Sequence, residues 1–167
     1  MHQAVDAAEV DEGAEVDDGG HGALETHALG QFGEDFGALV LAALLKQHAA
    51  EEMEHMHRLF RYVSETGALP LVGALKAPPV QYKNLAEVFK ATYEHELEVT
   101  RSINALVAAA LAEQDFSTFQ FLQWYVSEQH EEEHLFKGIL DKIDVIGIDG
   151  RGLYFLDEEI RKLAAAD

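Results

Sequence analysis

The sequence predicts an all-α fold in which long amphipathic helices pack side by side as a bundle. Two observations indicate this fold. Apolar residues recur with the spacing of one helix face over three long segments, and each apolar face carries polar side chains near its midpoint. A third observation is the stretch 67–82, which holds all three Pro residues of the chain. It predicts a long crossover loop that lets two consecutive helices lie parallel.

The N-terminal region differs in composition from the rest of the chain. Residues 1–45 hold ten Asp and Glu residues and no Lys or Arg, and seven of the thirteen Gly residues precede residue 38. Gly weakens a helix interior by about 1 kcal/mol relative to Ala. The sequence therefore predicts an acidic, Gly-rich region over 1–40, in place of a first bundle helix, and one helical domain over 41–167.

The first predicted helix spans 36–64 and has ionisable residues on its apolar face. That face consists of Leu41, Leu45, His48, Glu52, His55, Leu59 and Tyr62. Buried ionisable groups need a partner, and Glu52 and His55 lie one turn apart, so one metal ion can satisfy both. His48 is interpreted as a core histidine satisfied by hydrogen bonding, with ligation as the alternative.

Two further long helices are predicted after the loop. Asn84 is the expected N-cap of the second, with Glu87 completing a capping box, and this helix runs to about Gln114. Asp115 caps the third, which runs to about Val145. Their inward faces are Leu85, Phe89, Thr92, Glu96, Val99, Ile103, Leu106 and Ala110, and then Phe119, Leu122, Val126, Gln129, Glu132, Phe136, Ile139 and Ile143.

The end of the chain carries one more predicted helix. Three Gly residues, Gly147, Gly150 and Gly152, are expected to interrupt helical structure, and a short helix is expected over 153–166.

Other charged residues offer competing pairs. On the third helix Gln129 and Glu132 are preferred over Glu131 and His134, since the latter face also holds Ser127, His130 and Gly138. Residues off the apolar faces are predicted to be solvated: Glu54, His57, Glu94 and Glu98.

Composition restricts the classes of function. The net charge of −19 argues against nucleic-acid binding and favours cations. The chain has no Cys, so metal ligands must be Glu, Asp, His or Gln, a set that suits iron or manganese at least as well as zinc. No long apolar run or basic leader is present, so we expect no membrane span, and the cytoplasm is the default location.

Three segments closely resemble the bacterial non-haem ferritins. They are Gln47–Phe60, with its Glu52-x-x-His55, then Thr92–Glu96, and Phe119–Glu133, with Gln129 and Glu132. The segment Gly152-Leu153-Tyr154-Phe155, at the start of the last predicted helix, also resembles this family. The resemblance implies a ferritin-like four-helix bundle with a short fifth helix. It further implies a homo-oligomeric shell of 24 subunits that oxidises Fe(II) with dioxygen or peroxide and stores the ferric mineral.

The resemblance also implies roles for single residues. Glu52 corresponds to the carboxylate that bridges two irons, and His55 corresponds to a ligand of the first iron. Glu96 and Glu132 correspond to ligands of the second iron, and Gln129 corresponds to a residue beside that iron. Glu51, Glu128 and Glu131, with Glu132, match a third iron site, and Trp124 matches a tryptophan next to the centre. No haem is expected, although Met53 and Met56 leave a haem-bearing bacterioferritin as a less favoured alternative.

The resemblance fails before about residue 40. Family members begin with a helix that supplies another glutamate and a tyrosine, and the aligned positions here are Gly19 and Thr26. One hypothesis is that this part of the gene is read in a shifted frame. For the chain as written we expect weak or absent ferroxidation and poor shell assembly, and the alternative function is a catalytically impaired metal-binding bundle.

Overall fold

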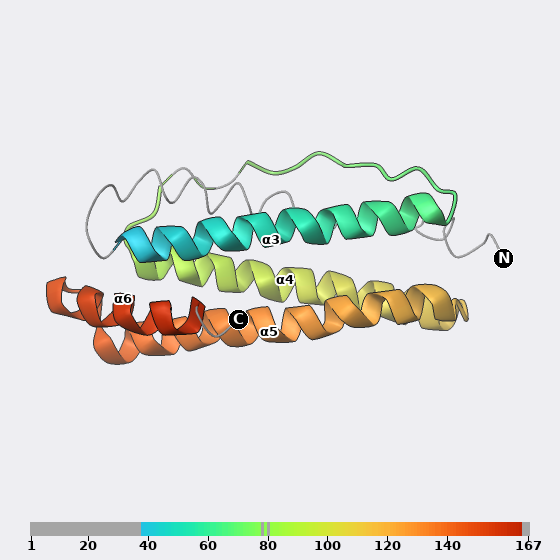
Figure 1. Cartoon of the computed structure of the whole chain (residues 1–167). Helices are drawn as coiled ribbons and strands as arrows, with labels where there is room; N and C mark the ends of the chain where they lie inside the picture. The colour runs from blue at the N-terminus through green and yellow to red at the C-terminus, as the bar shows by residue number, and fades with distance from the viewer. Residues whose placement is uncertain (1–37, 78, 80, 165–167) are drawn as a thin grey trace.

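The computed structural model describes residues 38–77, 79 and 81–164, and its regular elements are all helices (Figure 1). They are α3 (Ala38–Glu65), α4 (Leu85–Ala112), α5 (Phe116–Ile146) and α6 (Gly150–Ala164). The predicted all-α fold is confirmed for this part of the chain. The acidic region predicted over 1–40 lies, but for its last three residues, outside the described residues, as do Gly19 and Thr26.

The three long helices run side by side along most of their length (Figure 1). α3 and α4 point the same way, because the chain returns along the bundle between them, and α5 runs antiparallel to α4. α6 folds back against α5 and α3. The crossover predicted from the Pro residues is confirmed.

Two of the helix ends follow the Schellman pattern. At the end of α3, Gly67 has φ of 89°, its N–H donates to the carbonyl of Ser64, and that of Ala68 donates to the carbonyl of Val63. At the end of α4 the left-handed position is taken by Gln114, with φ of 58°. Because this motif ends α4 directly before Asp115, the next helix begins at once and must reverse direction.

The predicted N-caps of α4 and α5 are confirmed. The Asn84 side chain accepts the N–H of Glu87 at 2.9 Å, and the Asp115 side chain accepts the N–H of Thr118 at 3.0 Å. The capping box differs in its second bond, since the Glu87 carboxylate accepts the N–H of Lys83 instead of that of Asn84. The bond therefore satisfies the N–H of the residue before the N-cap, whereas a capping box satisfies the N–H of the N-cap residue itself.

The start of α6 corrects a prediction. Gly150 and Gly152 were expected to interrupt helical structure, but both lie in the first turn of α6. Asp149 caps this turn, because its side chain accepts the N–H of Gly152 at 2.9 Å and its carbonyl accepts that of Leu153 at 2.7 Å. A Cβ at Gly152 would lie 2.4 Å from the carbonyl oxygen of Gly147, so this Gly permits a close approach of two backbones.

The buried apolar residues form two clusters with a polar layer between them. The larger cluster joins α3, α4, α5 and α6 and includes Leu45, Phe89 and Phe136. The smaller joins α4 and α5 and includes Ile103 and Leu122. The polar residues predicted at the helix midpoints therefore lie between two packed apolar cores.

One predicted core position on α5 is wrong. Val126 is 36% exposed, whereas Tyr125 beside it is 6% exposed and belongs to the smaller cluster. The Tyr125 hydroxyl donates to the backbone carbonyl of His55 at 2.8 Å, so this position faces α3.

Among the described residues, no helix is both long and apolar enough to cross a membrane.

Replacing Gly152 by Ala should destabilise the fold, because the added Cβ meets backbone atoms that cannot give way. The loss in the free energy of unfolding should be about 1–3 kcal/mol, as for other overpacked positions. Gly138→Ala is the matched control, since nothing lies within 4 Å of a Cβ there and Ala favours a helix interior by about 1 kcal/mol. Urea unfolding of both variants would contradict this account if Gly152→Ala were as stable as Gly138→Ala.

Candidate metal centre

A layer of buried polar side chains crosses the bundle at the level predicted from the sequence. Each long helix contributes two members, whose exposed fractions are between 1 and 7%: His48 and Glu52 from α3, Thr92 and Glu96 from α4, and Gln129 and Glu132 from α5. Carboxylates are rarely this buried without a charged partner. The layer therefore concentrates negative charge where water is scarce.

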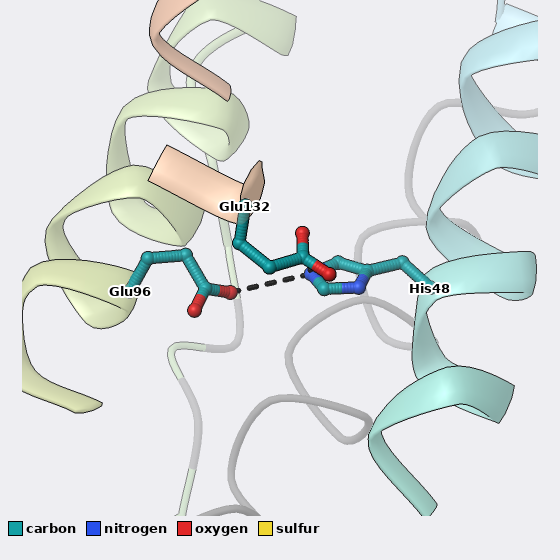
Figure 2. Close-up of side chains that lie close together, drawn as sticks. All are labelled: His48, Glu96 and Glu132. Carbon is teal, nitrogen blue, oxygen red and sulfur yellow. Dashed lines mark hydrogen bonds and ion pairs between the residues drawn. The ribbon is translucent and has the colours of Figure 1, made fainter. Parts of the chain in front are cut away.

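His48 lies between two of these carboxylates. Its Nε2 atom is 3.2 Å from Oε1 of Glu96 and 3.5 Å from Oε2 of Glu132, and the three side chains converge from three helices (Figure 2). The other ring nitrogen, Nδ1, is 3.9 Å from Oε1 of Glu52. The ring packs against Phe136 with the centroids 4.8 Å apart, which fixes its plane.

Gln129 is oriented by a chain of hydrogen bonds. Its amide donates to Oε2 of Glu96 at 3.0 Å and, over 3.4 Å, to the hydroxyl of Thr100. That hydroxyl gives its own hydrogen to the carboxylate of Glu133 at 2.6 Å, so it can only accept from Gln129. The chain of bonds therefore directs the Gln129 NH₂ group toward α4.

His55 lies on the next turn of α3 and faces two carboxylates. Its Nδ1 atom is 3.5 Å from Oε1 of Glu52, and its Nε2 atom is 3.6 Å from Oε1 of Glu128 on α5. The ring meets the edge of Trp124 with the centroids 5.1 Å apart. The guanidinium of Arg58 lies 4.2 Å from the centre of that indole, which favours this position of Trp124.

The electrostatics of the layer follow from this crowding. Burial raises the pKa of Glu132 to about 7; the nearby His48 opposes the rise, and the carboxylates of Glu96 and Glu52 add to it. Burial also lowers the pKa of His55. Its hydrogen bond with Glu52, together with the charges of Glu52, Glu128 and Glu132, outweighs that effect, so the net shift is upward. A bound cation would remove the repulsion that disfavours the ionised form of Glu132.

The structure brings together most of the site residues named from the sequence. Glu52, His55, Glu96, Gln129 and Glu132 lie in or next to the layer. Burial raises the pKa of Glu128, opposed by His55 and reinforced by the charges of Glu131 and Glu51. Glu51 and Glu131 themselves are exposed, so this trio lies at the outer edge of the layer.

The competing pairs occupy the positions expected of solvated residues. The side chains predicted to be solvated are exposed, and so are those of the rejected pair on α5: Glu54, His57, Glu94, Glu98, Glu131 and His134. The preference for Gln129 and Glu132 as the inward pair on α5 is confirmed by their burial.

Three residues near the layer were not assigned to it from the sequence. His48 was interpreted as a hydrogen-bonded core histidine, which its contact with Glu96 confirms, but it also forms a compact group with Glu96 and Glu132. Thr100 and Glu133 carry no predicted role in the sequence analysis. Their spacing is the signal that identifies them, since Thr100 lies one helical turn after Glu96 and Glu133 directly follows Glu132.

The arrangement can hold divalent cations. Carboxylate oxygens and imidazole nitrogens are ligands of iron, manganese and zinc, and here they come from rigid helices whose positions are set by packing above and below. Among the described residues, His48, Glu96 and Glu132 each offer an atom within 4.8 Å of the others.

Removing the Glu132 carboxylate should alter how the stability of the metal-free protein depends on pH. A carboxyl whose folded pKa lies above its unfolded value stabilises the fold at low pH, and the contribution is lost as pH rises through about 7. As the pH rises from 5 to 8, the free energy of unfolding of Glu132→Gln should therefore increase relative to that of the parent by about 3 kcal/mol. Denaturant titrations at both pH values measure it, and a gain no larger than that of the exposed control Glu54→Gln would contradict the assignment.

Replacing Thr100 by Val should loosen Gln129 without changing side-chain shape. The variant loses the acceptor for the amide and the donor to Glu133, and we expect a loss of about 1 kcal/mol in the free energy of unfolding. Ser102→Ala is the control, because its exchange removes only a hydroxyl bonded to a carbonyl in its own helix. Equal stability of Thr100→Val and the parent would show that the chain of bonds is energetically unimportant.

Comparisons with known proteins cover most of the chain. A family model described as Ferritin, ferritin-like domain, matches residues 24–146. A bacterial non-heme ferritin of Escherichia coli O157:H7 is 53% identical over 122 residues, which are 73% of this chain and 74% of that protein. A bacterial non-heme ferritin of Campylobacter jejuni is 51% identical over 122 residues, which are 73% of each chain.

Solved structures agree with this match. An open pore ferritin from the archaeon Archaeoglobus fulgidus superimposes with a TM-score of 0.80 at 34% identity, covering 96% of this chain and 95% of that chain. The Chlorobium tepidum ferritin gives a TM-score of 0.63 at 42% identity, covering 91% and 98%. The resemblance to bacterial non-haem ferritins is thus confirmed, and the chain belongs to the ferritin family.

Proposed function

We propose that this protein binds Fe(II) in the buried polar layer, oxidises it, and stores the ferric product. The observation that carries the proposal is the convergence of Glu52, Glu96 and Glu132 from three helices, with imidazole and amide groups beside them, between two apolar clusters. Among relatives, proteins named bacterial non-heme ferritin share half or more of their residues with this chain over the matched region.

The proposed roles follow the positions of the side chains. Glu52 lies between His48 and His55 on α3 and is placed to bridge two ions, with His55 on one side. Glu96 and Glu132 bind the second ion, and Gln129 is held beside it by Thr100. A further binding site for iron that enters or leaves the layer lies at its outer edge and consists of Glu51, Glu128 and Glu131.

The chemistry needs only positioning and charge from the protein. Two Fe(II) ions give one electron each, which reduces dioxygen to hydrogen peroxide with the uptake of two protons, or peroxide to water. Carboxylates stabilise the higher charge of Fe(III), and the apolar clusters limit the access of water to the layer. The chain needs no haem for this reaction.

A second candidate is a metal-binding bundle with impaired oxidation. It is favoured by the ligand count, because the resemblance assigns only Glu52 and His55 among the described residues to the first ion. The resemblance also implies that Gly19 stands where family members have a further glutamate. Such a protein would bind Fe(II) but would oxidise it weakly or not at all.

Assembly and location complete the proposal. We propose that the chain forms a homo-oligomer, as the family resemblance implies, and that it works in the cytoplasm. Large apolar side chains of the crossover support assembly, since Leu69 is 78% exposed and Leu71 is 80% exposed. Size-exclusion chromatography with light scattering tests this point, and a monomer at micromolar concentration would contradict it.

Rapid mixing of Fe(II) with oxygenated protein tests the function directly. The parent should develop the near-ultraviolet absorbance of Fe(III), and Glu96→Gln should reduce the initial rate at least tenfold because it removes a charge from the centre of the layer. Glu94→Gln makes the same chemical change on the outer face of α4 and should keep the rate of the parent.

An anaerobic titration separates the two candidates. Fe(II) is first bound without oxygen, and oxygen is then admitted. Saturable binding followed by a ferric signal supports oxidation, whereas binding without that signal supports the impaired bundle. Equal rates in the parent and Glu96→Gln would exclude the layer as the site of oxidation.

A further inference from the structure

The outward face of α5 has two histidines that none of the roles proposed above uses. His130 and His134 lie four residues apart near the middle of the helix, and both side chains are exposed. No hydrogen bond or ion pair joins either imidazole to another residue in the described part of the chain. Both rings are therefore free to bind a ligand from solution.

Packing of the opposite face fixes the direction of this pair. Glu132 lies two residues from each histidine and is 7% exposed, and Phe136 on the same inward face is fully buried. With 3.6 residues per turn, the histidines lie opposite Glu132, roughly 40° apart around the helix axis and about 6 Å apart along it. The helix thus presents a carboxylate to the buried layer and an imidazole pair to solvent.

Two imidazoles at this spacing can bind one ion together. The Cβ atoms of residues four apart on a helix lie roughly 5–6 Å apart, and an imidazole nitrogen binds a transition metal at about 2.0–2.1 Å. Because the rings extend beyond their Cβ atoms, both can turn toward an ion placed between them. The helix holds the second ring close once the first has bound, which raises its effective concentration.

The neighbouring charges favour a cation at this position. Glu131 and Glu133 each lie three residues from one of the two histidines, so a carboxylate flanks the pair on either side. Lys137, three residues after the second histidine, donates to the carboxylate of Asp141, which compensates its charge. The chain as a whole has a net charge of −19. A divalent ion on this face therefore meets little repulsion.

The segment 130–134 also matches the H-E-x-x-H signature of zinc proteases. A catalytic zinc centre of that class has a third protein ligand, and its glutamate acts as the base. Among the described residues, the one compact group of three possible ligands lies in the buried layer and does not include this pair. The pair is therefore suited to binding a metal and not to hydrolysis.

We propose that His130 and His134 form a surface site for one divalent transition-metal ion that prefers nitrogen ligands. Cu(II) binds most tightly, and Ni(II) and Zn(II) bind more weakly, as the general affinity order of these ions requires. Water molecules complete the coordination. Mg²⁺ and Ca²⁺ prefer oxygen ligands and do not compete. The site is separate from the buried layer and does not rest on the oxidation of iron.

Cu(II) titration of the full-length, metal-free protein tests the site. Electron paramagnetic resonance of the parent should show nitrogen hyperfine coupling from bound imidazole. His130→Gln and His134→Gln should each weaken the binding of this ion about tenfold or more, because the second point of attachment is lost. His57→Gln on the exposed face of α3 and His55→Gln beside the layer are the matched controls and should keep it.

A spacing series separates joint binding from two independent histidines. In the His134→Gln background, Ser127→His gives a pair with His130 at a spacing of three residues and should restore Cu(II) binding. Lys137→His in the same background places the second imidazole roughly 10 Å from His130 along the helix and should not restore it. Both replaced side chains are exposed, and circular dichroism checks that every variant stays helical.

Three results would overturn the inference. One is unchanged Cu(II) affinity in both His130→Gln and His134→Gln. Another is equal restoration by Ser127→His and Lys137→His, which would show that spacing is irrelevant. The third is Cu(II) binding that is lost in Glu96→Gln and kept in His134→Gln, which would place the copper in the buried layer.

The outcome is separable from that of the proposed function. His134→Gln should lose Cu(II) binding and still oxidise Fe(II) at the rate of the parent. A parent that binds Cu(II) through this pair but never oxidises Fe(II) supports the inference and contradicts the proposed function. Iron oxidation in a protein whose Cu(II) binding ignores both histidines does the reverse.

Discussion

The constraint on which the rest of the structure depends is the burial of three carboxylates in one layer. Glu52, Glu96 and Glu132 are each less than 10% exposed and come from three different helices. Burial disfavours their ionised forms, and repulsion between the like charges adds to this cost. The pKa of Glu132, raised to about 7 chiefly by burial and further by the charges of Glu96 and Glu52, expresses it. Only nearby donors and cations can offset it.

The fold supplies the means to keep the layer together. Apolar clusters on both sides hold α3, α4 and α5 in register, so the carboxylates cannot separate without exposing packed side chains. Among the described residues, His48 and Gln129 form hydrogen bonds with Glu96. The crossover makes α3 and α4 parallel, which brings the midpoints of both helices to the same level as that of α5 (Figure 1).

Much of this arrangement was predictable because helix periodicity determines which residues share a face. The interrupted apolar faces of α3 and α4 identified Glu52 and Glu96 as inward residues, and the caps Asn84 and Asp115 fixed where α4 and α5 begin. The length of the 67–82 stretch was enough to predict the crossover.

Other features depend on contacts between distant residues and were beyond a reading of periodicity. Tyr125 replaces Val126 in the core because its hydroxyl reaches a carbonyl of α3. Gly152 lies within a helix because a neighbouring backbone comes too close for a side chain. The position of His48 between two carboxylates follows from how three helices pack, which no single helix face specifies.

The central claim is that the polar layer holds metal ions between the three helices. Crystals soaked in Fe(II) without oxygen, with diffraction recorded on both sides of the iron absorption edge, test it most directly. The account predicts anomalous peaks among Glu52, Glu96 and Glu132, within bonding distance of their oxygens. Iron found only on the acidic surface, with the layer free of anomalous signal, would contradict it.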